Sequence, residues 1–168
     1  DGILKEIRCA EGEVYTPDSD HLVLQIHFGM ANQYSRNLSR NVKRGNYYRF
    51  HNKKQWLGPA KIGWLNVTNP ETKEKEIVVD SDRFSIVAKG IRLILSGAHT
   101  PMQVLHKLNT EWGFRTRRTE RQGGKPLSKS GWYKLLADPY LYGLMIRSEG
   151  ETMGNHKPML SEEEFIRL

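Results

Sequence analysis

The chain has 168 residues, of which 38% are hydrophobic, and a formal net charge of +7 from 26 Lys and Arg against 19 Asp and Glu. No apolar run reaches the roughly 18 residues of a membrane span, so we expect no membrane partner. The single Cys9 excludes an internal disulfide and a cysteine-based zinc site. The histidines lack a metal-ligand spacing, so we expect no metal and no cofactor.

The two ends of the sequence suggest a piece of a longer protein. The opening DGILKEIRC shows neither an initiator Met nor the apolar core of a secretory leader, and the chain stops abruptly at Leu168. We therefore expect a fragment. The single cysteine fits a reducing, cytoplasmic compartment.

Basic residues are concentrated in two blocks. His21 to Pro70 contains eight Lys or Arg and no acid, and Arg115 to Lys134 contains seven against Glu120 alone. A charge run is often only a solvated surface, but two blocks so poor in acid favour a polyanionic partner. We expect nucleic acid.

The first predicted region, residues 1–45, is a strand with its flanks followed by a long helix from about 20 to 45. Thr16 to Asp20 has the composition of a helix start, and Gly45-Asn46 that of a stop. The first half of the helix is apolar nearly all round, and residues 1–20 are too few to cover it. We expect a missing N-terminal domain or a partner subunit to do so, through an oligomerisation row made of Leu22, Ile26, Met30, Tyr34 and Leu38.

Residues 46–63, here called the linker, lack any periodicity, and a compact domain is predicted to follow over 64–168. The fold class is α+β and mainly helical: a long N-terminal helix, an extended linker, and a domain with a small antiparallel sheet and a helix-turn-helix-like unit. The predicted elements of the domain are a hairpin (64–67 with 75–79), helices at 80–95, 100–112 and 128–137, paired late strands at 142–147 and 157–159, and a last helix from 161.

Helices 100–112 and 128–137 follow each other as in a helix-turn-helix, although the connection is longer than the usual turn. Such a unit places the start of its second helix against bases in the major groove. The blander interpretation is an ordinary capped surface helix. The predicted base-reading residues are Ser128, Lys129, Ser130, Tyr133 and Lys134.

An extended basic segment such as the linker suits the minor groove, where negative potential is concentrated. Trp56 and Trp64 could equally serve only to pin the linker onto the domain. The candidate minor-groove residues are Arg49, Lys53, Lys54 and Lys61. Phosphate contacts are expected from Arg40, Lys43, Arg44, Arg117, Arg118 and Arg121.

The order of these segments resembles the large serine recombinases, the family of phage serine integrases and transposon recombinases. Nearly the whole chain takes part. The segments that carry the resemblance are, in order, TPDSDHLVLQIHFGMANQYSRNLSRNVKRG, GPAKIGWLN, DSDRFSIVAKGIRLILSG, TPMQVLHKLNTEWGF, LSKSGWYKLLADPYLYGLM and GNHKPMLSEEEF.

The resemblance implies a site-specific recombinase that cuts DNA through a serine nucleophile and acts as a dimer or tetramer on a duplex attachment site during integration or excision. It implies the end of the catalytic domain with an oligomerisation helix in 1–45, a DNA-binding linker in 46–63 and the DNA-binding domain in 64–168. It implies a bacterial or phage-encoded protein that is cytoplasmic and associated with the nucleoid. The family's nucleophile region and zinc ribbon have no counterpart here, so we assign no catalytic serine and expect the fragment alone to be inactive. Ser35 and Asn41 stand where many members carry arginine.

Two other functions fit the same residues. A non-enzymatic helix-turn-helix transcriptional regulator could use the same helix pair. A basic RNA-binding protein is the weaker alternative, because the sequence contains no motif typical of RNA-binding modules.

Overall fold

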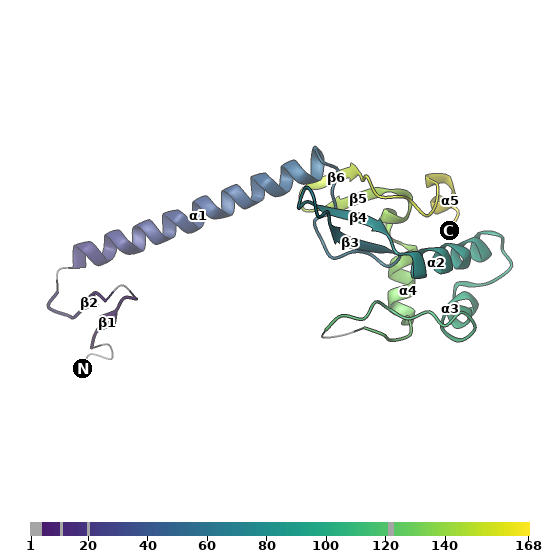
Figure 1. Cartoon of the computed structure of the whole chain (residues 1–168), viewed down its shortest axis with the longest axis horizontal. Helices are drawn as coiled ribbons and strands as arrows, with labels where there is room; N and C mark the ends of the chain where they lie inside the picture. The colour runs from purple at the N-terminus through teal and green to yellow at the C-terminus, as the bar shows by residue number, and fades with distance from the viewer. Residues whose placement is uncertain (1–4, 11, 20, 121–122) are drawn as a thin grey trace. The chain divides into compact units, whose positions relative to one another are not determined.

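The computed structural model describes residues 5–10, 12–19, 21–120 and 123–168. The chain divides into two compact units, Asp1–Gly45 and Asn46–Leu168 (Figure 1). The fold is α+β with a long N-terminal helix and short antiparallel strand pairs, which confirms the predicted fold class. None of the helices in the described ranges is long and apolar enough to cross a membrane.

The first unit is a small hairpin followed by most of the long helix α1. Strand β1 (Ile7–Arg8) pairs with β2 (Val14–Tyr15), and α1 runs from His21 to His51. Among the apolar residues in the first half of α1, only Leu24 is half-buried, while Phe28 is 60% exposed. The hairpin therefore leaves this helix face uncovered, as expected from the little apolar surface in residues 1–20.

The predicted end of the long helix at Gly45 is wrong, because α1 continues to His51. A glycine inside a helix costs about 0.5–1 kcal/mol, whereas burying a phenylalanine contributes about 1.5–3 kcal/mol. Phe50 is fully buried in the second unit, and the His51 Nε2 lies 2.8 Å from the Glu149 carbonyl oxygen. Tertiary packing thus outweighs the local stop signal, and residues 46–51 of the predicted extended linker are helical.

After the end of α1, the regular structure of the second unit continues with a hairpin and a helix, both predicted. Strand β3 (Trp64–Thr68) pairs with β4 (Lys75–Val79), with Trp64 opposite Val79. Helix α2 (Ser81–Leu95) follows at once, because the buried Asp80 caps it by accepting a hydrogen bond from the Asp82 backbone N–H.

Helices α3 (Pro101–Thr110) and α4 (Lys129–Leu136) form the predicted helix pair. Thr100 and Gln103 form a capping box at the start of α3. After the short 3-10 helix η1 (Pro139–Tyr142) and a final strand pair, the chain ends with α5 (Glu162–Ile166), which confirms the predicted last helix.

The predicted pairing of the late strands is wrong. Strand β5 (Leu144–Arg147) pairs with β6 (Gly150–Met153), and residues 157–159 form no strand. Gly150 has a φ of +120°, which allows a tight reversal directly after Arg147. Met159 instead binds η1, since its backbone N–H donates to the Leu141 carbonyl at 2.8 Å.

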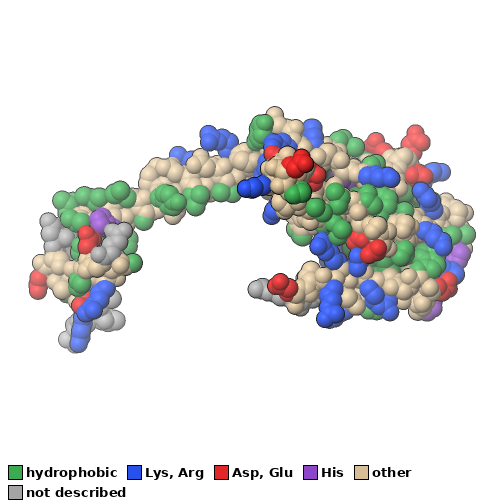
Figure 2. All heavy atoms as spheres, viewed as in Figure 1, with side chains coloured by type: hydrophobic (Ala, Val, Ile, Leu, Met, Phe, Trp, Pro, Cys, Tyr) green, Lys and Arg blue, Asp and Glu red, His purple; other side chains and the backbone are tan. Residues whose placement is uncertain are grey.

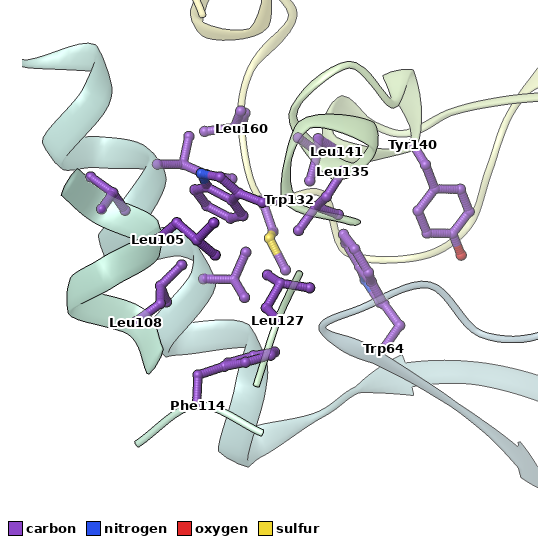
Figure 3. Close-up of a cluster of buried hydrophobic side chains, with 14 of the residues drawn as sticks. Trp64, Leu105, Leu108, Phe114, Leu127, Trp132, Leu135, Tyr140, Leu141 and Leu160 are labelled. Atoms are coloured by element: carbon purple, nitrogen blue, oxygen red, sulfur yellow. The ribbon is translucent and has the colours of Figure 1, made fainter. Parts of the chain in front are cut away.

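One hydrophobic core holds the second unit together (Figure 3). Trp132 of α4 lies in its middle, with Leu105 and Leu108 of α3 on one side and Leu135 and Leu141 on the other. The core therefore joins the two helices of the predicted DNA-reading pair to the rest of the domain.

Candidate nucleic-acid interface

Helix α4 buries one face and presents its first turn to solvent. Trp132 is fully buried, and its indole N–H donates to the Pro101 carbonyl at 2.9 Å, which ties α4 to the start of α3. The Ser128 hydroxyl caps the helix by accepting from the Gly131 N–H at 3.1 Å. All five predicted base-reading residues are exposed on this element: Ser128, Lys129, Ser130, Tyr133 and Lys134.

Asn109 fixes where α4 begins, a role that sequence reasoning missed. Its side-chain amide donates to the Leu127 carbonyl at 2.9 Å, and its side-chain oxygen accepts from the Leu127 N–H at 2.8 Å. Both backbone hydrogen-bonding groups of Leu127 are thereby held by one side chain of α3. A polar residue directly after the buried Leu108 was the available signal.

Residues 115–125, here called the arm, leave the core between α3 and α4. Phe114 is buried at the base, and the Thr116 N–H donates to the Lys125 carbonyl at 2.9 Å, so the arm closes on itself. Gly123 has a φ of +104°, and a side chain there would meet the Arg117 carbonyl oxygen at 1.9 Å. This closure requires glycine at that position.

The arm presents free cations. Arg117 and Arg118, both predicted phosphate contacts, are exposed, and no ion pair involves them in the part of the chain that the structure describes. Figure 2 shows basic side chains along this part of the second unit. Arg115 is exposed as well, but its guanidinium donates to the Asn109 carbonyl at 3.0 Å. Arg121 lies outside the described residues.

Three of the four predicted minor-groove cations have partners in residues 64–168, beyond the linker. Lys53 pairs with Glu74 and Lys61 with Asp138, while the Lys54 ammonium donates to the Thr152 hydroxyl at 2.8 Å. The fourth, Arg49, is exposed and donates to the Asn46 side-chain oxygen at 2.8 Å. These contacts hold the linker cations against the domain.

Aromatic rings hold the linker as well. Trp56 meets Tyr140 edge-on, with ring centroids 5.2 Å apart, and the Lys61 ammonium lies 4.9 Å from the Trp56 ring centre. Trp64 is buried, and its indole N–H donates to the Lys157 carbonyl at 3.0 Å. The pinning role considered for Trp56 and Trp64 is therefore present in the structure.

The rings of Tyr140 and His156 stack on each other, with their centroids 3.6 Å apart. His156 Nε2 lies 2.9 Å from the Tyr140 carbonyl oxygen. This carbonyl requires a proton on Nε2, so in the neutral ring Nδ1 carries none and is buried without a hydrogen-bond partner among the described atoms. Burial lowers the pKa of His156, since a charge would be poorly solvated there. Burial also raises the pKa of the Tyr140 hydroxyl, and the nearby Asp138 carboxylate raises it further.

In the first unit, four of the six Lys and Arg residues lie in the second half of α1. The predicted phosphate contacts Arg40, Lys43 and Arg44 are exposed, and no ion pair involves them within the described ranges. The predicted oligomerisation row on the same helix is exposed too, with Leu22 at 60% and Tyr34 at 71%. Across the described residues, no cluster of three or more His, Cys, Asp or Glu could hold a metal ion.

Comparisons with known proteins give no family model and no curated protein that matches the chain. Two solved structures are similar in fold. One, from work on the sequence requirements of the Listeria innocua prophage attP site, is 19% identical, with 74% of this chain and 47% of that chain covered and a TM-score of 0.49. The other, the crystal structure of an LSR–DNA complex, is 19% identical over 73% of this chain and 34% of that chain, with a TM-score of 0.45. The matched region is less than half the length of either protein.

Proposed function

We propose that this chain binds duplex DNA as the DNA-binding part of a site-specific serine recombinase. The observation that carries the proposal is the first turn of α4, where exposed hydroxyl and ammonium groups project from a helix anchored by Trp132 and Asn109. A rigid helix with a free polar end suits the major groove, whose base edges present distinct donors and acceptors. The base-reading role falls to Ser128, Lys129, Ser130, Tyr133 and Lys134.

The charge distribution supports a phosphate-rich partner. Between Arg115 and Lys134 the only acid is Glu120, and Arg117 and Arg118 are exposed on the arm. Cations without an internal partner are free to replace the counterions of a DNA backbone. We assign phosphate contacts to this arm, to Arg121 in the same stretch of sequence, and to Arg40, Lys43 and Arg44 of α1.

The linker is proposed to follow the minor groove with Arg49, Lys53, Lys54 and Lys61. Because three of these cations have partners in the domain, binding in the groove requires DNA phosphates to replace Glu74, Asp138 and the Thr152 hydroxyl. The order of segments that resembles the large serine recombinases supports this division into residues 1–45, 46–63 and 64–168.

Self-association is proposed for the parent protein, as a dimer or tetramer on its attachment site. The support is the exposed row Leu22, Ile26, Met30, Tyr34 and Leu38 on α1, each at least half exposed. Contiguous apolar surface of this kind is typical of protein–protein contacts. No residue of the chain is assigned as a nucleophile.

Two substitutions test the proposal. Lys129→Ala should relax sequence preference at one base position by about 1–3 kcal/mol, whereas Arg118→Ala should weaken binding to all sequences alike. Binding is measured by titrating a selected duplex and a random duplex with each variant. Identical behaviour of the two variants on both duplexes would contradict the assignment of α4 as the reading helix.

A further inference from the structure

The arm is flanked by two hollows that belong to the same surface. One, about 300 Å³, lies between the arm and the linker segment Pro59 to Trp64. The other, about 480 Å³, lies between the arm and the first turn of α4, with Ser128 and Gly131 in its wall. Ile62, Thr116 and Arg117 line both. The hollows are therefore two parts of one groove, which crosses the base of the arm from the linker to α4.

The walls of this groove are held firmly at the arm base. The Arg83 guanidinium donates to the Arg115 carbonyl at 2.8 Å and to the Asp80 carboxylate at 2.9 Å, so it ties the arm to the start of α2. The Thr116 hydroxyl donates to the Lys125 carbonyl at 3.1 Å. The groove is thus bounded by hydrogen-bonded backbone on the arm side and by the packed Phe114 beneath it.

The charges along the groove are nearly all of one sign. Asp80 is the only acid in its walls among the described residues, and this carboxylate is 3% exposed and already paired with Arg83. Arg117 and Lys125 are exposed at its rim, and no ion pair involves either within the described residues. The groove therefore presents a positive rim with no exposed carboxylate.

The floor of the groove is apolar. Ile62 contributes to both parts, and Pro126 and Leu127 line the part next to α4. A DNA strand has the complementary pattern, since its deoxyribose rings offer apolar edges while its phosphates need cations or hydrogen-bond donors. A floor of this kind with cations at its edge fits a sugar–phosphate backbone better than it fits a peptide or a small anion.

We propose that this groove holds the sugar–phosphate backbone of one DNA strand, with Arg117 and Lys125 on successive phosphates and Ile62 under the sugars. The proposal rests on the proposed function and deepens it, because it adds Ile62, Thr116 and Lys125 to the interface. It also connects the linker to α4 along one strand. Phosphate contacts in the groove fix the register of α4 on the duplex without reading bases themselves.

The test compares two double variants of the whole chain with the same change in charge. R117A/K125A removes both groove cations. R92A/R167A removes two exposed arginines that line neither hollow and form no ion pair among the described residues. Each variant is titrated against a random-sequence duplex between about 50 and 200 mM salt, and its melting curve is compared with that of the parent chain.

The groove variant should lower the slope of log affinity against log salt by about two and weaken binding about tenfold or more at low salt, while the control keeps the parent slope. On a duplex selected for binding by the parent chain, phosphate-ethylation interference should lose a run of neighbouring phosphates on one strand in R117A/K125A only. Equal slopes for the two variants, or an unchanged ethylation pattern, would overturn the groove while leaving DNA binding intact. Failure of the parent chain to bind any duplex would overturn the proposed function, and the groove with it.

Discussion

The linker and the arm carry the same kind of charge in opposite surroundings. In the linker, Lys53 and Lys61 pair with Glu74 and Asp138, which lie far away in the sequence. In the arm, Arg117 and Arg118 are exposed, without an acid partner among the described residues. Charge density along a sequence therefore does not by itself tell which cations are available to a polyanion. Under the proposed function, the arm contacts DNA without losing an ion pair, while the linker must first exchange partners.

The largest expected effect concerns the scaffold on which the arm and α4 depend. Trp132→Ala removes a fully buried ring and its hydrogen bond to Pro101, so it should lower the free energy of unfolding by about 3–5 kcal/mol. Urea denaturation measures the change. Tyr133→Ala, at the exposed neighbouring position, is the control and should shift stability by about 0.5 kcal/mol or less. Similar losses in the two variants would contradict the anchoring role of Trp132.

Lowering the pH should reduce the protection of the linker from hydrogen exchange more than that of the arm. His156 lies against Trp64 and Tyr140, and its folded-state pKa is lowered, so protonation favours the unfolded chain. Stability is then complete above the unfolded pKa of about 6.5 and falls as pH drops below it, by up to about 1.4 kcal/mol per pH unit. Hydrogen exchange at pH 7 and pH 5.5 measures the change by segment. A greater loss of protection in the arm than in residues 52–63 between pH 7 and pH 5.5, after correction for intrinsic exchange rates, would contradict this prediction.

Removing a linker cation should cost stability, whereas removing an arm cation should not. Lys61→Ala leaves the half-buried Asp138 without its partner and should lower the free energy of unfolding by about 1 kcal/mol, a value reduced by partial exposure of the pair. Arg117→Ala should leave it unchanged within about 0.5 kcal/mol. Thermal melting of the two variants at moderate salt measures the difference. Equal melting temperatures of the two variants would contradict the claim that linker cations, unlike arm cations, stabilise the fold.

The elements of the second unit were largely predictable because their signals are local. Asp80, Thr100, Ser128 and Ser161 all cap the helices that follow them, and apolar spacing identified the buried faces of α2, α3 and α4. What could not be predicted depends on contacts between distant segments. Because Phe50 is buried, α1 continues beyond Gly45 to His51. Because the chain reverses before Gly150, β5 pairs with β6 and not with residues 157–159.

The same limit applies to the candidate interface. The first turn of α4 was found from its capping serine and the lysines beside it, because the helix period separates inward Trp132 from outward Tyr133. Other contacts join residues that only the fold brings together. They are the two hydrogen bonds between the Asn109 side chain and the Leu127 backbone, and the ion pairs of the linker. A sequence shows the sign and number of charges, but not the carboxylates that face them.

The most direct test of the central claim is a selection of bound duplexes from a randomised DNA library at moderate salt, using the whole chain and its Lys129→Ala variant. We expect a motif about one to two helical turns long, with an A·T-rich segment beside a major-groove element that Lys129→Ala relaxes at one position. Binding that is tight and strongly dependent on salt, but without any enriched motif, would contradict it. In that case the basic segments would act only as an electrostatic tether, and α4 would not read DNA sequence.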